Sequence, residues 1–158
     1  MRFGTNYLRF WRVAAAGLAF SALVAPSSLN GRERPSIEEL KGRLASADVA
    51  DRPPVCIQIS ELHLAEADRL YIAGDSEKAQ AALGDAITYA ESARDYAIQS
   101  HKHEKQSEIA LRKMVRKLND IKHTVSHDDQ DQIQNTINRL QSIRDDLLTA
   151  MFPKVGKK

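Results

Sequence analysis

The 158-residue sequence is poor in cysteine, proline, glycine and aromatic residues, with one Cys, five Pro, seven Gly and 6% Phe, Trp and Tyr. The single cysteine, Cys56, excludes an internal disulfide framework, a paired-cysteine haem attachment site and a cysteine-rich zinc site. The sequence also contains no phosphate-binding loop and no glycine-rich dinucleotide turn, and its Ser, Asp and His residues have no catalytic spacing. We therefore expect a protein without enzymatic activity and without a cofactor.

A strong net charge is also lacking once the N-terminus is set apart. The formal charge of +2 includes Arg2, Arg9 and Arg12, whereas no acidic residue lies in the first 27 positions. The rest of the chain is close to neutral, so it has no global field that would attract a polyanion. Nucleic acid is therefore not an expected partner.

The N-terminal residues predict export. The three arginines precede an apolar run from Val13 to Ala25, and Ala25 and Ser27 place small residues at alternate positions, as signal peptidase requires. The run is shorter than the roughly 17–25 residues that a membrane span needs. We interpret residues 1–27 as a cleavable signal peptide, with an uncleaved N-terminal anchor as the alternative. The mature protein is then expected to be periplasmic or secreted, and not an integral membrane protein.

The plentiful residues, chiefly Ala, Leu, Lys, Glu, Gln and Arg, favour helices, so the expected fold class is all-α. Residues 28–53 are interpreted as a linker with a short helix at 37–46, because Ser36 and Glu39 have the spacing of a capping box. A helical domain is expected over 54–152, followed by a tail at 153–158.

Local signals divide this helical domain. The proline pair at 53–54 allows a helix to begin there, and Gly74 is a natural helix end. Ser126 and Asp129 repeat the capping-box spacing. The chain should therefore turn just before Ser126 and form a last helix over about 128–151.

Small or apolar residues recur at alternating spacings of four and three from Ala79 to Val125. This heptad phase continues without a slip through the polar segment 99–107, QSHKHEKQS. A break near residue 101 and one long helix both fit the composition, and the preserved phase favours a continuous helix over 76–125. We call this stripe of small or apolar residues the seam; it is alanine-rich over 79–97 and leucine-rich over 111–125. The last helix should fold back on the leucine-rich half, and the helix before Gly74 should pack on the alanine-rich half. The predicted architecture is an antiparallel helical bundle on one long central helix.

Residues 60–93 resemble a single tetratricopeptide repeat, which is a helix–turn–helix unit with small residues where the two helices touch. The matching positions are Ala67, Leu70, Tyr71, Gly74, Asp75, Ala79, Leu83 and Ala86. Because hairpins of that family bind peptides or proteins, the resemblance implies interaction with a protein partner. Segments 108–123 and 143–152 also resemble a family of small exported bacterial helical proteins without an assigned function.

The hairpin at 55–97 is the predicted interaction surface, since its alanine seam is shallow and it carries Tyr71, Tyr89 and Tyr96. Tyrosines supply large contact area at modest entropic cost. The alternative is that these tyrosines cover a thin core. In an oxidising compartment, Cys56 could in addition link two chains by a disulfide.

Two further sets of residues support alternative functions. His123 and His127 are four residues apart and could chelate a metal ion on one helix, although Ser126 is expected to separate them. A basic stripe could contact anionic lipid or cell wall, and it consists of Arg112, Lys113, Arg116 and Lys117. The favoured hypothesis is a non-enzymatic exported scaffold or adaptor, and the alternatives are a periplasmic metal-binding protein and an envelope-surface binder.

Overall fold

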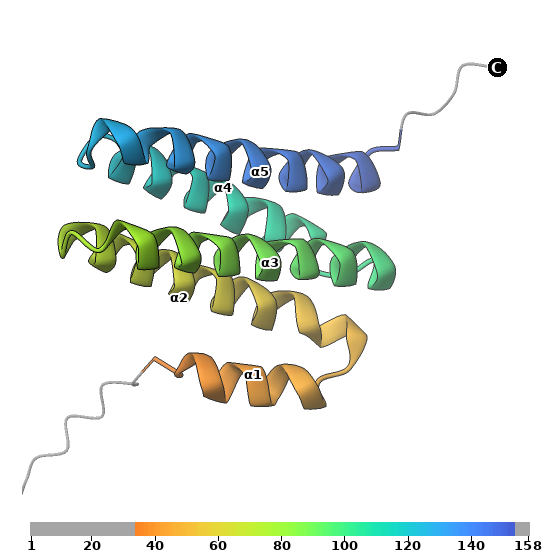
Figure 1. Ribbon diagram of the computed structural model, residues 1–158. Helices are drawn as coiled ribbons and strands as arrows, with labels where there is room; N and C mark the ends of the chain where they lie inside the picture. The colour runs from red at the N-terminus through yellow and green to blue at the C-terminus, as the bar shows by residue number, and fades with distance from the viewer. Residues whose placement is uncertain (1–33, 154–158) are drawn as a thin grey trace, which may run out of the picture. The chain divides into compact units, whose positions relative to one another are not determined.

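The computed structural model describes residues 34–153, so the predicted signal peptide, the first part of the predicted linker and residues 154–158 lie outside the described residues. Every regular element within this range is a helix, which confirms the all-α prediction. The elements are α1 (Ile37–Ser46), the short 3₁₀ helix η1 (Val49–Asp51), α2 (Arg52–Ile72), α3 (Ser76–Ser100), α4 (Glu104–Lys122) and α5 (His127–Met151). Figure 1 labels the five α-helices.

The locally encoded helix ends are where the sequence predicts them. At the start of α1, the Glu39 amide donates to Ser36 Oγ at 3.2 Å, and the Ser36 amide donates to Glu39 Oε2 at 2.8 Å, so the capping box is complete. The proline pair lies in the first turn of α2. Gly74, with φ of 80°, makes the turn into α3, because glycine adopts a positive φ without a steric penalty.

The predicted continuous helix over 76–125 is wrong, because the chain breaks between α3 and α4. His101 and His103 adopt left-handed conformations, with φ of 53° and 63°. The inward face is nevertheless as predicted: Ala97 and Leu111, on opposite sides of the break, are both fully buried. A heptad phase reports which face of a helix points inward, and two helices that share one core can keep that phase although the chain reverses direction.

The described helices form two antiparallel hairpins, α2–α3 and α4–α5, with α1 beside α2. The hairpins pack so that α2 contacts α4 and α3 contacts α5, while α3 also contacts α4 across the bundle. The link between the hairpins therefore crosses a diagonal of the four-helix arrangement. As predicted, α2 packs on the alanine-rich seam of α3, and α5 folds back on the leucine-rich seam of α4.

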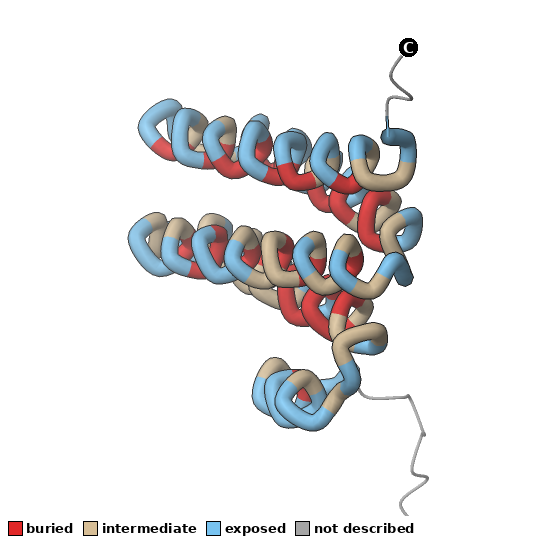
Figure 2. The backbone as a smooth tube through the Cα atoms, turned by 90° about the vertical axis from the view of Figure 1, so that its right-hand side faces the viewer, coloured by how far each residue is buried: buried red, intermediate tan, exposed pale blue. Residues whose placement is uncertain are grey.

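The buried residues lie on the sides of the helices that face one another (Figure 2). The larger core cluster joins all four long helices, whereas a smaller cluster consists of Leu40, Val55 and Ile59 beneath α1. One buried polar group links the layers: Ser60 Oγ donates to the Ala86 carbonyl at 2.5 Å and lies 3.9 Å from Met114 Sδ. None of the helices in this part of the chain has the length and apolar character needed to cross a bilayer.

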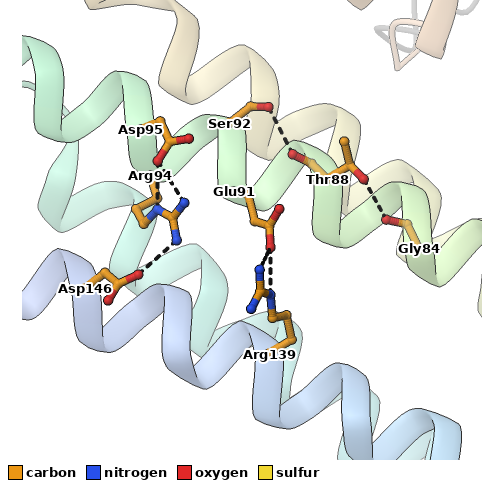
Figure 3. Close-up of polar contacts among 8 residues, drawn as sticks. All are labelled: Gly84, Thr88, Glu91, Ser92, Arg94, Asp95, Arg139 and Asp146. Atoms are coloured by element: carbon orange, nitrogen blue, oxygen red, sulfur yellow. Dashed lines mark hydrogen bonds and ion pairs between the residues drawn. The ribbon is translucent and has the colours of Figure 1, made fainter.

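Ion pairs fix the register of α3 against α5 on the surface (Figure 3). Arg94 Nη1 donates to Asp146 Oδ2 at 2.9 Å, and Arg139 Nε donates to Glu91 Oε1 at 2.7 Å. Exposed pairs of this kind contribute under about 1 kcal/mol each. Their main effect is therefore to select one alignment of the two helices.

Candidate functional site

Three adjoining hollows lie along the outer face of α2. The largest, about 370 Å³, is between α1 and α2, and two smaller ones, of about 200 and 180 Å³, are between α2 and α4. Glu61 and Ala65 line both of the first two hollows, and Gln58 lines the first and the third. Residues 58, 61 and 65 follow one exposed face of α2, so the three hollows adjoin along this face, and we call them together the α2 groove.

The α2 groove has α2 as its floor, with α1 on one side and α4 on the other, as the order of these helices in Figure 1 shows. Its floor is largely apolar, with Leu62, Leu64 and Ala65 from α2 and Met114 from α4. Ala65 is exposed, and its small side chain leaves the floor open at this point. The α2 groove therefore presents apolar surface between polar side chains.

The margins of the α2 groove are more basic than acidic. Arg34, Lys113 and Lys117 line it, against Glu61 as the one carboxylate among the lining residues. Lys117 also pairs with Asp68 at 2.6 Å. Desolvation raises the pKa of Glu61 above its ordinary value, while Lys113 and Arg34 act in the opposite direction. Desolvation outweighs the two cations, so the net effect is a raised pKa even though Glu61 is exposed.

The structure does not gather the three predicted tyrosines into one surface. Tyr89 is half-buried in the small cluster beneath α1 and stacks on His63, with ring centroids 5.7 Å apart and planes at 14°. Tyr96 is half-buried against the main core, and the Arg52 guanidinium lies 5.1 Å above its ring. Tyr71 is half-buried, its hydroxyl has no hydrogen-bond partner among residues 34–153, and desolvation raises its pKa to about 12. None of the three lines the α2 groove.

The two candidate metal-binding histidines are separated by a turn. His123 follows α4 as its C-cap, whereas His127 is the first residue of α5, after Ser126. Both are exposed. Among residues 34–153, no group of three or more His, Cys, Asp or Glu side chains is placed to hold a metal ion.

Cys56 lies fully buried in the main core. Desolvation raises the pKa of its thiol to about 11, so the reactive thiolate is disfavoured. A disulfide between two chains through Cys56 would therefore require the bundle to open around α2.

The predicted basic stripe is exposed along α4. Arg112 pairs with Glu108 at 3.2 Å and Lys117 with Asp68, whereas Lys113 and Arg116 have no carboxylate within 4.0 Å among the described residues. Lys113 and Lys117 line the α2 groove, and Arg112 and Arg116 do not. The stripe thus divides between a groove margin and an open surface.

Sequence reasoning missed the α2 groove. Gln58, Glu61 and Ala65 follow a helical period that is typical of an ordinary solvated face, and nothing local to them indicates that α1 and α4 flank that face. The one available signal was a small residue, Ala65, among larger polar neighbours on the outer stripe. Comparison of the chain with family models, with curated proteins and with solved structures finds no match.

Proposed function

We propose that this protein is a non-enzymatic helical adaptor, exported to the periplasm or beyond, that binds an amphipathic helix of a partner protein in the α2 groove. The observation that supports the proposal is that three hollows adjoin along the exposed face of α2, where they share Gln58, Glu61 and Ala65, and that Leu62, Leu64 and Met114 add apolar surface to their lining. In this proposal, the α2–α3 hairpin serves as a single tetratricopeptide-like unit whose outer face is completed by α1 and α4.

A helix is the expected ligand because of the shape and chemistry of the groove. The hollows lie between neighbouring helices, and amphipathic helices insert their apolar face into hydrophobic grooves of this kind. The margins carry Arg34, Lys113 and Lys117 against Glu61, so the matching helix has acidic residues beside its apolar stripe. Charge complementarity sets the choice of partner more than its affinity.

The test uses a fluorescently labelled synthetic helix of Leu and Glu as the probe and the mature chain as the receptor, with fluorescence anisotropy as the readout. Ala65→Arg places a long charged side chain on the open floor and should weaken binding at least tenfold. Ala81→Arg is the matched control, because Ala81 is an exposed alanine on α3 that does not line the groove. Equal affinities of the two variants would refute the groove as the binding site.

A second comparison tests the charge of the partner. Lys113→Glu should weaken binding of the acidic helix, and a helix of Leu and Lys with the same apolar face should bind the unmodified protein at least tenfold less tightly.

Sedimentation with vesicles of anionic phospholipid distinguishes the adaptor proposal from the alternative of an envelope-surface binder. An envelope-surface binder should sediment with the vesicles, lose this binding when Arg116 is replaced, and keep it in Ala65→Arg. If the protein behaves in this way and does not bind the acidic helix, the envelope-surface alternative replaces the adaptor proposal.

A further inference from the structure

The link between α3 and α4 is short and strained. It consists of three residues, and two of them, His101 and His103, are L-residues in the left-handed region. That region is disfavoured for most residues with a side chain, because Cβ approaches the following carbonyl oxygen, and histidine adopts it more often than most but still rarely. His103 also makes no side-chain cap for α4. The closed bundle therefore holds this link in a conformation that its own residues do not favour.

The same residues are compatible with a helix. The segment QSHKHEKQS contains neither glycine nor proline. The inward positions Ala97, Ser100, Glu104 and Ser107 follow the spacings of three and four that one uninterrupted helix requires. With the link in helical conformation, residues 76–122 would form a single helix roughly 70 Å long at 1.5 Å per residue, with one continuous inward face.

Within a single chain, such a helix would separate the two hairpins. It would break the interaction of Ser60 with Met114, the pair between Lys117 and Asp68, and the α3–α5 ion pairs of Figure 3. The buried faces of both hairpins would become exposed to water. A second copy in the same straightened form presents the complementary hairpin, so each of these interactions can form again between chains.

We propose that this chain also forms a domain-swapped dimer, in which residues 76–122 of each copy are one continuous helix and each α4–α5 hairpin packs on the α2–α3 hairpin of the other copy. Exchange of an identical element is a low-cost route to a dimer, and short strained hinges favour it. The dimer keeps the packing of the closed bundle and relieves two left-handed residues per chain. In the dimer, the floor of the α2 groove and its α4 side come from different copies.

The first experiment replaces the two left-handed residues of the hinge and reads out the oligomeric state, because His103 also lines the third hollow of the α2 groove. His101→Ala with His103→Ala favours the helical link, whereas His101→Gly with His103→Gly accommodates the left-handed turn. After exchange at high concentration in mild denaturant and refolding, sedimentation velocity measures the dimer fraction. We expect the alanine pair to raise the dimerisation constant at least tenfold above that of the unmodified protein, and the glycine pair to lower it at least tenfold. Equal dimer fractions, or no dimer in either variant at millimolar concentration, would overturn the proposal.

The second experiment distinguishes a swapped dimer from a side-by-side one. Glu91→Cys and Arg139→Cys place thiols across the α3–α5 contact, in a chain that also carries Cys56→Ala, and a short bismaleimide links them. In the closed monomer the link stays within one chain, whereas in the swapped dimer it joins two chains and gives a covalent dimer on a denaturing gel. A dimer fraction that yields only internally linked monomers would contradict the swap.

Discussion

Asp129 is the residue that connects the starts of α3 and α5. Its carboxylate accepts hydrogen bonds from Ser126 Oγ at 2.7 Å, from Ser76 Oγ at 2.9 Å and from Gln80 Nε2 at 3.4 Å. The hydrogen bond from Ser126 is the chief cause that lowers the pKa of this carboxyl below its ordinary value. The capping box expected at this turn does not form: the Ser126 side chain does not cap α5, and its hydroxyl donates to the Asp129 carboxylate instead.

Asp129→Asn should lower the free energy of unfolding by about 1–2 kcal/mol at pH 7, since hydrogen bonds to an ionised acceptor are lost. A lowered folded-state pKa contributes stability above the unfolded value, near 3.9, and this contribution is lost as pH falls through the folded pKa. The difference between variant and unmodified protein should therefore shrink from pH 7 to pH 3 in urea unfolding. The control is Asp128→Asn, because Asp128 is an exposed acid in the same first turn of α5. It measures the effect of removing one negative charge near the helix N-terminus. A pH-independent difference would contradict this role.

The two faces of α4 allow a direct test of which residues of this helix belong to the core. Leu118 is completely buried and Arg116 is exposed two residues earlier. Leu118→Ala should lower the free energy of unfolding by about 2–5 kcal/mol, because it removes buried methyl groups and leaves a cavity. Arg116→Ala should change it by less than about 0.5 kcal/mol. If chemical denaturation shows similar decreases in the free energy of unfolding for both variants, the face of α4 that carries Leu118 does not form the core.

At the scale of elements, α1 depends on a few contacts. A helix of ten residues is marginal in water by itself. It is held by its capping box and by Leu40, which is fully buried against Val55 and Ile59. Local opening of α1 should therefore require less free energy than global unfolding.

Leu40→Ala should release α1 while the four long helices remain folded. Hydrogen exchange followed by mass spectrometry should show faster exchange over 37–46 by at least tenfold, with no comparable change in α3 or α5. Lys41→Ala is the control, because Lys41 is exposed on the same helix. Uniformly faster exchange along the chain would mean that α1 unfolds only together with the bundle.

Some element boundaries could be predicted from sequence and others could not, for a physical reason. The capping box of Ser36 and Glu39 and the turn at Gly74 are encoded within a few residues, so the sequence alone predicts them. The break at His101 and His103 has no glycine or proline to mark it, because tertiary packing imposes it against local preference. The α2 groove was missed for a similar reason: α1 and α4 create it, and they are far from Ala65 in sequence. The all-α class followed from composition, and the inward face of α4 from its periodicity.

At the scale of the whole bundle, the two hairpins pack differently. The seam of α3 is alanine-rich, with Ala79, Ala90, Ala93 and Ala97 fully buried, so α2 can approach it closely. The seam of α4 carries Leu111, Met114 and Leu118, which bury more area per residue. Packing against α5 thus relies on large side chains, whereas packing of α2 on α3 relies on close backbone approach.

Because the two hairpins follow one another along the chain, contacts within a hairpin join residues that are nearer in sequence than contacts between the hairpins. Within α2–α3, the hydrogen bond from Ser60 to Ala86 joins residues 26 positions apart, whereas Arg94 to Asp146 and Ser60 to Met114 span 52 and 54 positions. Closing longer loops costs more entropy, and chains rich in local contacts fold faster. Each hairpin is therefore expected to form before the two dock, and docking becomes the slow step. The rate of folding would then depend on the order in which the helices are connected more than on the strength of any single contact.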